Sequence, residues 1–161
     1  MTDLDKIAVI RAATENFFEQ ENLKFTPFDE HNVASATYNV DAKFGHATVF
    51  FRVNKDRLLL RTIIPLNAGK ADRQKIAEFL LRANYGLKTG GFDMDFDDGE
   101  ISYRVSIFCG VEDFVPPTYE QIDFSVIISL MMIERYGDAL VKVMFGLVEP
   151  EDAIEAVESD D

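Results

Sequence analysis

The residues with the clearest potential for chemistry are five carboxylates in one short run: Asp93, Asp95, Asp97, Asp98 and Glu100. Carboxylates at this spacing suggest a calcium loop, but an EF-hand loop that began at Asp93 would need glycine at its sixth position and glutamate at its twelfth. The sequence has aspartate and arginine there. Alternation with apolar residues instead predicts a strand whose carboxylates face solvent. A weak cation site at the tip formed by Asp97, Asp98 and Glu100 stays open as an alternative.

The two histidines and the single cysteine are far apart in the sequence. His31 and His46 are separated by fifteen positions, and neither is close to Cys109. Metal sites built from imidazole and thiolate groups usually have closer spacing. Glu112 and Asp113 follow Cys109, and their charges would raise a thiol pKa and oppose a nucleophilic thiolate. The sequence therefore predicts no catalytic residue, no metal site and no cofactor.

The chain is strongly acidic, and its charge is unevenly distributed. Its 161 residues suit one domain with a real core, and 29 acidic against 16 basic side chains give a formal charge of −13. Seven of the acidic residues lie in residues 149–161, which contain no lysine or arginine. Subtracting those seven charges from −13 leaves −6 for residues 1–148. We expect one domain over residues 1–148, followed by a mobile acidic tail over 149–161 with one helical turn.

Composition also limits the partners and the location. A strong negative charge repels nucleic acid and anionic lipid. The longest uncharged apolar stretch, residues 124–133, is far shorter than the roughly 20 residues of a membrane-spanning helix. A single cysteine excludes an internal disulfide and fits a reducing compartment, and the acidic start lacks the features of a signal peptide. We expect a soluble cytoplasmic protein with neither nucleic acid nor membrane as a partner.

Hydrophobic periodicity predicts the elements that position these residues. Helices are expected over 3–21, 71–85 and 118–147, and strands over 23–28, 33–40, 46–53, 57–64 and on both sides of residues 98–99. Pro27 weakens the first strand and favours an edge position. Short connections at 41–45 and 54–56 require antiparallel neighbours. The predicted fold class is α+β, an antiparallel sheet with helices mainly on one face in the order α-β-β-β-β-α-β-β-α.

The hairpin around residues 98–99 has an expected register. Its Asp-Gly pair favours a two-residue turn, which places Phe96 opposite Ile101 and Met94 opposite Tyr103. Phe92 then shares the same inward face. A slip of one residue would turn this whole apolar set to solvent and the aspartates to the core, so we expect the register to be tightly fixed.

The last expected helix is apolar on two sides in its first half. At 100° per residue one stripe forms the core face, with Tyr119, Ile122, Val126, Leu130, Ile133, Leu140 and Met144. The opposite side carries apolar residues first and charged residues later. The helix at 3–21, a dimer contact or a groove for a client protein could each cover it. The candidate interface residues are Phe124, Ile128, Met131, Met132 and, as a polar rim, Arg135.

Two segments resemble the YbjN family of bacteria, whose members are labelled as candidate sensory transduction regulators. Residues 80–87 (LLRANYGL) and 90–101 (GGFDMDFDDGEI) are similar to its helix with an Asn-containing end and its short acidic-apolar hairpin. The order of elements over residues 1–147 is also similar. The resemblance implies a fold like that of type III secretion chaperones, which are dimeric acidic proteins that hold a segment of another protein. It implies no catalytic residues.

The resulting hypothesis is a non-enzymatic, cytoplasmic protein-binding module. It would be chaperone-like or a regulator of signalling, with a polypeptide partner and a homodimer as one form of that partner. The alternative is a regulatory domain that binds a small ligand or a cation. An enzyme is the least favoured class, because the sequence has no cluster of titratable groups at readable spacing.

Overall fold

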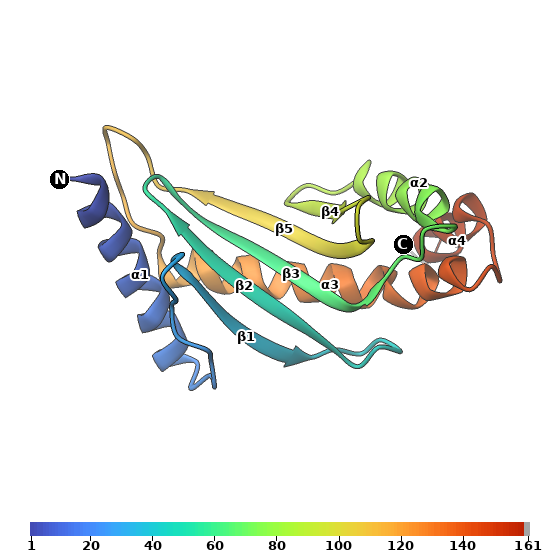
Figure 1. Cartoon of the computed structure of the whole chain (residues 1–161), viewed down its shortest axis with the longest axis horizontal. Helices are drawn as coiled ribbons and strands as arrows, with labels where there is room; N and C mark the ends of the chain where they lie inside the picture. Colours follow the sequence, from blue (N-terminus) through green and yellow to red (C-terminus); the bar gives the residue numbers. More distant parts are fainter. Residues whose placement is uncertain (160–161) are drawn as a thin grey trace.

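The computed structural model describes residues 1–159 (Figure 1). Its elements are α1 (Asp3–Gln20), β1 (Val33–Asn39), β2 (His46–Asn54), β3 (Arg57–Asn67), α2 (Arg73–Asn84), β4 (Gly91–Met94), β5 (Glu100–Phe108), α3 (Tyr119–Met144) and α4 (Pro150–Glu158). The five strands form one antiparallel sheet in the order β1-β2-β3-β5-β4. The predicted α+β class with an antiparallel sheet is confirmed.

The helices that contact the sheet pack on one of its faces. Along β2 and β3, every second side chain is buried on that face, as period-2 alternation requires. α1 packs against β2, α2 against β4, and α3 against β3 and β5. In Figure 1, α3 passes behind β2 and β3. Over residues 1–159, no helix lies on the opposite face, which we call the open face.

The core consists of two clusters joined by α3. In the first, Phe17 and Phe18 of α1 surround Phe51 of β2, with the Phe18 and Phe51 rings edge-on at 4.9 Å. In the second, Phe92 lies edge-on to Tyr103 at 5.0 Å. Full burial of a large apolar side chain contributes about 1.5–3 kcal/mol. Both clusters depend on α3, whose partly buried Leu130 packs against each.

Two expected strands differ in extent from the prediction. Residues 23–28 form a single bridge, between Thr26 and Ser35, because Pro27 has no N–H to continue a ladder. β3 continues past residue 64 to Asn67, with a shift in register between Ile63 and Asn67. The order of the elements along the chain otherwise follows the expectation.

The predicted register of the β4–β5 hairpin is wrong by two residues. Met94, not Phe96, lies opposite Ile101, and residues 96–99 form a longer turn. Arg73 fixes this turn by donating to the carbonyl oxygen of Phe96 at 2.9 Å. Gly99 packs so closely on Ala68 that a Cβ would lie 2.0 Å from its carbonyl oxygen. A shift of two preserves the faces, so Phe92 and Met94 still point inward, but Phe96 is 55% exposed in the turn.

The acidic tail contains a packed helix. Residues 150–158 form α4, which begins with Pro150 and buries Ala153 and Ile154 against α2 and α3. The apolar residues of this segment recur at helical spacing between the carboxylates. Only one helical turn is expected from the sequence because the segment is so rich in acidic residues. Two acidic residues of the expected tail, Asp160 and Asp161, lie outside the described residues. Within residues 1–159, no helix combines the length and apolar character needed to cross a membrane.

Candidate functional site

The outer side of α3 carries an exposed apolar stripe in its first half. Phe124, Ile127 and Met131 are 51%, 45% and 53% exposed and follow one another at helical spacing. Ile128 and Met132 are half-buried beside the stripe and pack against the core. We call Phe124, Ile127 and Met131 the α3 stripe.

Arg135 lies one turn beyond Met131 on the same side of α3. Its guanidinium stacks over the ring of Tyr136, with 5.4 Å between Cζ and the ring centroid. The five residues predicted as an interface thus occupy one side of α3, two of them exposed apolar residues, two half-buried and one an exposed arginine.

α1 does not cover the stripe. Its Phe17 ring packs on Tyr119 in the first turn of α3 with centroids 5.6 Å apart, and Glu21 accepts a hydrogen bond from the Tyr119 hydroxyl. Ile10 and Phe18 of α1 belong to the same buried cluster as Ile122 and Val126 on the core side of α3. Of the covers considered from the sequence, the helix at 3–21 is therefore excluded by this geometry.

The β1–β2 loop covers part of the second half of α3. Glu134 and Asp138 accept hydrogen bonds from the backbone N–H groups of residues 41 and 43 at 3.0 and 2.8 Å. Phe44 lies on Gly137, where a Cβ would come within 2.9 Å of the ring. The loop does not cover Phe124, Ile127 or Met131, which stay exposed. The outer side of this helix is therefore covered only in part.

The acidic tip uses its carboxylates to hold its own turn. Asp95 accepts a hydrogen bond from the N–H of Asp97 at 2.8 Å, and Asp98 accepts one from the N–H of Glu100 at 2.9 Å. These are Asx-turn contacts, which organise backbone and direct the oxygens inward. In the described part of the chain, no three His, Cys, Asp or Glu side chains are grouped as a metal site would require.

The histidines and the cysteine lie apart in the fold. His31 and His46 are both exposed, and His31 contacts Glu30 at 3.4 Å. Cys109 is buried, and that burial raises the pKa of its thiol. Its Sγ lies 3.6 Å from the carbonyl oxygen of Ile107. The thiol is therefore held in its protonated form, which is the weaker nucleophile.

A second surface, the open face of the sheet, was not among the predicted sites. Four of the eight arginines project from it, namely Arg52, Arg57, Arg61 and Arg104. The alternation of side chains along each strand predicts which face of that strand carries its arginines. Only the pairing of β3 with β5 brings Arg104 onto the same surface as the arginines of β3. The sequence did not predict this surface because it did not give the order of the strands in the sheet.

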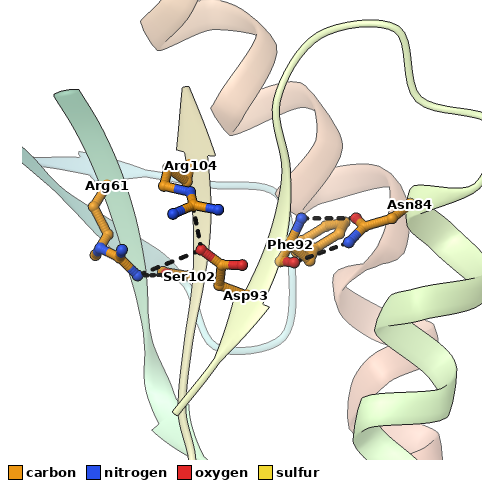
Figure 2. A network of polar contacts seen from close by, with 6 residues as sticks. All are labelled: Arg61, Asn84, Phe92, Asp93, Ser102 and Arg104. Atoms are coloured by element: carbon orange, nitrogen blue, oxygen red, sulfur yellow. Dashed lines mark hydrogen bonds and ion pairs between the residues drawn. The ribbon is translucent and has the colours of Figure 1, made fainter. Parts of the chain in front are cut away.

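An ion-pair network occupies the centre of this face (Figure 2). Arg61 and Arg104 are directly opposite each other on β3 and β5. Asp93 of β4 reaches both, at 3.1 Å from Nε of Arg104 and 3.7 Å from Nη1 of Arg61. Arg61 also donates to the hydroxyl of Ser102 at 3.0 Å. One carboxylate is thus shared between two guanidinium groups.

The Asn84 side chain closes the outer edge of β4 (Figure 2). Its Nδ2 donates to the carbonyl oxygen of Phe92 at 2.9 Å, and its Oδ1 accepts from the Phe92 N–H at 2.7 Å. A primary amide has the same donor and acceptor pair as a peptide group, so Asn84 replaces one rung of a neighbouring strand. This contact explains the Asn-containing helix end as a folding feature that positions β4 and Asp93.

Two depressions shape the open face. One of about 270 Å³ is lined by Val33, Phe50, Arg52, Leu59, Arg61 and Ile63. The other, of about 510 Å³, lies between β5 and residues 84–93 and includes Arg57, Asp93 and Arg104. Arg57 itself is held by Asp56 through two hydrogen bonds of 3.0 and 2.9 Å, and this pairing lowers the pKa of the Asp56 carboxyl.

Fold and surfaces together define an α+β domain with one antiparallel sheet, a helical layer on a single face, and an acidic exterior. A family model described as “Putative bacterial sensory transduction regulator”, YbjN, matches residues 12–142. The chain belongs to the YbjN family. This confirms the resemblance drawn from residues 80–101, whereas the likeness to type III secretion chaperones stays a prediction.

One similar solved structure is described as “Crystal structure of YbjN, a putative transcription regulator from E. coli”. It shares 14% sequence identity, with 77% of this chain and 85% of that chain covered, and a TM-score of 0.55. At this identity the likeness shows a common fold. Comparison with curated proteins gives no match.

Proposed function

We propose that this chain is a non-enzymatic regulatory module that binds a polypeptide partner through the α3 stripe, and that it acts in the cytoplasm. The observation that carries the proposal is the exposure of Phe124, Ile127 and Met131 on one side of a single helix. A contiguous exposed apolar patch on a domain typically marks an interaction site. The family description as a regulator is compatible with this class.

The form of the stripe favours a helical or extended apolar segment as the partner. Residues at this spacing along one helix form a ridge that fits the groove of a facing element. Met131 is exposed and Met132 half-buried beside it, and methionine side chains adapt their shape to different partners. Arg135, one turn further on, would form the polar rim and pair with a carboxylate at the edge of the contact.

The positions of the histidines and the cysteine favour a binding role over a catalytic one. Neither histidine lies in an enclosed pocket, and the Cys109 thiol is buried with a raised pKa. The cation alternative receives no support at the tip formed by Asp97, Asp98 and Glu100, because no three possible ligand side chains of residues 1–159 are grouped there.

A matched pair of variants tests the proposal. Met131→Asp places a charge in the α3 stripe, whereas Leu81→Asp places one at an exposed apolar position of α2, where Leu81 is 74% exposed against 53% for Met131. Light scattering after size-exclusion chromatography gives the mass of each protein, and affinity capture from the native cell identifies a bound polypeptide. We expect a dimer or a specific complex with wild type and Leu81→Asp that is lost with Met131→Asp.

Burying a charge in an apolar contact costs several kcal/mol, enough to remove a complex of ordinary affinity. If all three proteins are monomers that capture the same polypeptides, the α3 stripe is not the binding surface.

A further inference from the structure

The open face of the sheet combines guanidinium groups with apolar side chains in a regular pattern. Arg52 of β2 lies opposite Leu59 of β3, and Phe50 of β2 lies opposite Arg61 of β3. Apolar and cationic groups therefore alternate along and across the two strands. Phe50, Leu59 and their neighbour Ile63 are half-buried but belong to neither cluster of the core. Their exposed parts line the same depression as Arg52 and Arg61.

These guanidinium groups retain unused hydrogen-bonding capacity. Arg61 and Arg104 share the single carboxylate of Asp93, although each guanidinium has five N–H donors. Arg52 makes no hydrogen bond or ion pair with residues 1–159. The pKa of Asp29 is lowered mainly by hydrogen bonds from backbone N–H groups, and the charge of Arg52 adds only a smaller contribution.

Arg61 and Arg104 are a like-charge pair across neighbouring strands. Like charges directly opposite each other on neighbouring strands are unfavourable, and Arg61 and Arg104 occupy such positions. Asp93 offsets part of this repulsion. A second carboxylate supplied from outside would offset the rest. Local features that oppose stability are expected where a surface serves binding.

We propose that the open face binds an acidic polypeptide segment in which carboxylates are interspersed with apolar side chains. The carboxylates pair with Arg52, Arg61 and Arg104, for which the planar guanidinium fork is well matched. The apolar side chains of the segment pack on Phe50, Leu59 and Ile63, with area removed from water on both sides. This surface lies on the side of the sheet away from α3, so the inference goes beyond the α3 stripe and does not depend on it.

Charge complementarity favours a short acidic peptide over a nucleic acid. The face is a cationic area on a chain whose formal charge is −13. A nucleic acid strand extends a continuous line of phosphates, which would run from this face onto acidic surroundings. Asp93 of the edge strand β4, beside Arg61 and Arg104, also opposes a continuous polyanion. A short peptide with a few carboxylates can match the length of the arginine-bearing area without extending onto the acidic surface around it.

Fluorescence anisotropy with a defined probe tests the inference. The probe is a labelled dodecapeptide of repeating Glu-Leu-Glu-Ser units, and its control replaces each glutamate with glutamine. We expect wild type to bind the glutamate peptide more tightly than the glutamine peptide, with affinity that falls as salt screens the charges. Arg61→Gln together with Arg104→Gln should raise the Kd about a hundredfold, since each lost charge-assisted bond is worth about tenfold or more.

The controls separate this surface from the rest of the molecule. Arg82→Gln removes an exposed arginine of α2, which pairs with Glu78 at 3.5 Å, and should leave the Kd unchanged. Lysine at positions 61 and 104 keeps the charge without the fork and should give an intermediate Kd. Met131→Asp should bind the peptide as wild type does, so a failure of the α3 proposal is distinguishable from a failure here. Circular dichroism verifies that each variant is folded.

Three results would overturn the inference. The first is equal or absent binding of the two peptides, and the second is an unchanged Kd in a folded double arginine variant. The third is tighter binding of single-stranded oligo-dT than of the glutamate peptide, which would assign the face to nucleic acid.

Discussion

Phe50 and Phe51 are consecutive residues of β2 that point to opposite faces of the sheet. Phe51 is fully buried against the Phe17 and Phe18 rings of α1. Phe50 is half-buried, lies between Ser35 and Arg61 in the strand register, and has no helix over it. The same strands therefore form the wall of the core on one side and an unpartnered surface on the other. Stability comes from the first face, and the second is available for recognition.

Truncating the two phenylalanines separately should give the largest difference in stability between the two faces. Phe51→Ala should lower the free energy of unfolding by about 3–5 kcal/mol, because it leaves a cavity among aromatic rings. Phe50→Ala should lower it by about 1 kcal/mol or less, as is usual for partly exposed positions. Urea unfolding followed by circular dichroism measures both.

If Phe51→Ala does not fold, Phe51→Leu provides a milder change at the same site. Similar losses for the Phe50 and Phe51 variants would mean that the open face is part of the structural core.

A smaller loss of stability is expected at the outer edge of β4, where Asn84 binds the strand. Asn84→Ala removes both hydrogen bonds to the Phe92 backbone and should cost about 1–3 kcal/mol, because a partly buried N–H and C=O lose their partner. Asn84→Asp keeps an acceptor for the N–H but places an oxygen against the Phe92 carbonyl, so it should not restore stability. Hydrogen exchange at the Phe92 amide reports the loss directly. Unchanged protection in Asn84→Ala would show that β4 is held by β5 alone.

Much of the fold was predictable because burial sets the pattern of apolar residues. The alternation in β2 and β3 follows from a period of 2 residues and is as expected. On α3, where the period is 3.6 residues, Ile122, Val126, Ile133 and Leu140 of the predicted core stripe are buried, whereas Tyr119 at its start is 38% exposed. Resemblance over residues 80–101 also gave the family correctly. The outer stripe of α3 was recognisable for the same reason, since apolar residues such as Phe124 and Met131 had no evident cover.

The remaining features depend on contacts between distant parts of the chain. The hairpin register is set by Arg73 and by the packing of Gly99 on Ala68, which no local turn rule contains. The covered half of α3 depends on the loop that carries Phe44. The arginine face arises only when β5 pairs with β3. Surfaces that form only when particular strands become neighbours are therefore the hardest features to predict from the sequence.

The smallest effect on stability is expected from Asp93→Asn, which tests whether the ion pairs of the open face serve stability or binding. The carboxylate pairs with Arg61 and Arg104 at a half-exposed position, where ion pairs contribute about 0–1 kcal/mol. Stability measured by urea unfolding should therefore change by no more than about 1 kcal/mol. The same substitution removes the carboxylate that competes for both guanidinium groups, so the glutamate peptide should bind more tightly than to wild type. A large loss of stability, or weaker peptide binding by a folded variant, would indicate that the network exists to hold the sheet together. A core-facing residue would show the reverse pattern, with a large cost in stability and no gain in binding, because its partners lie inside the chain.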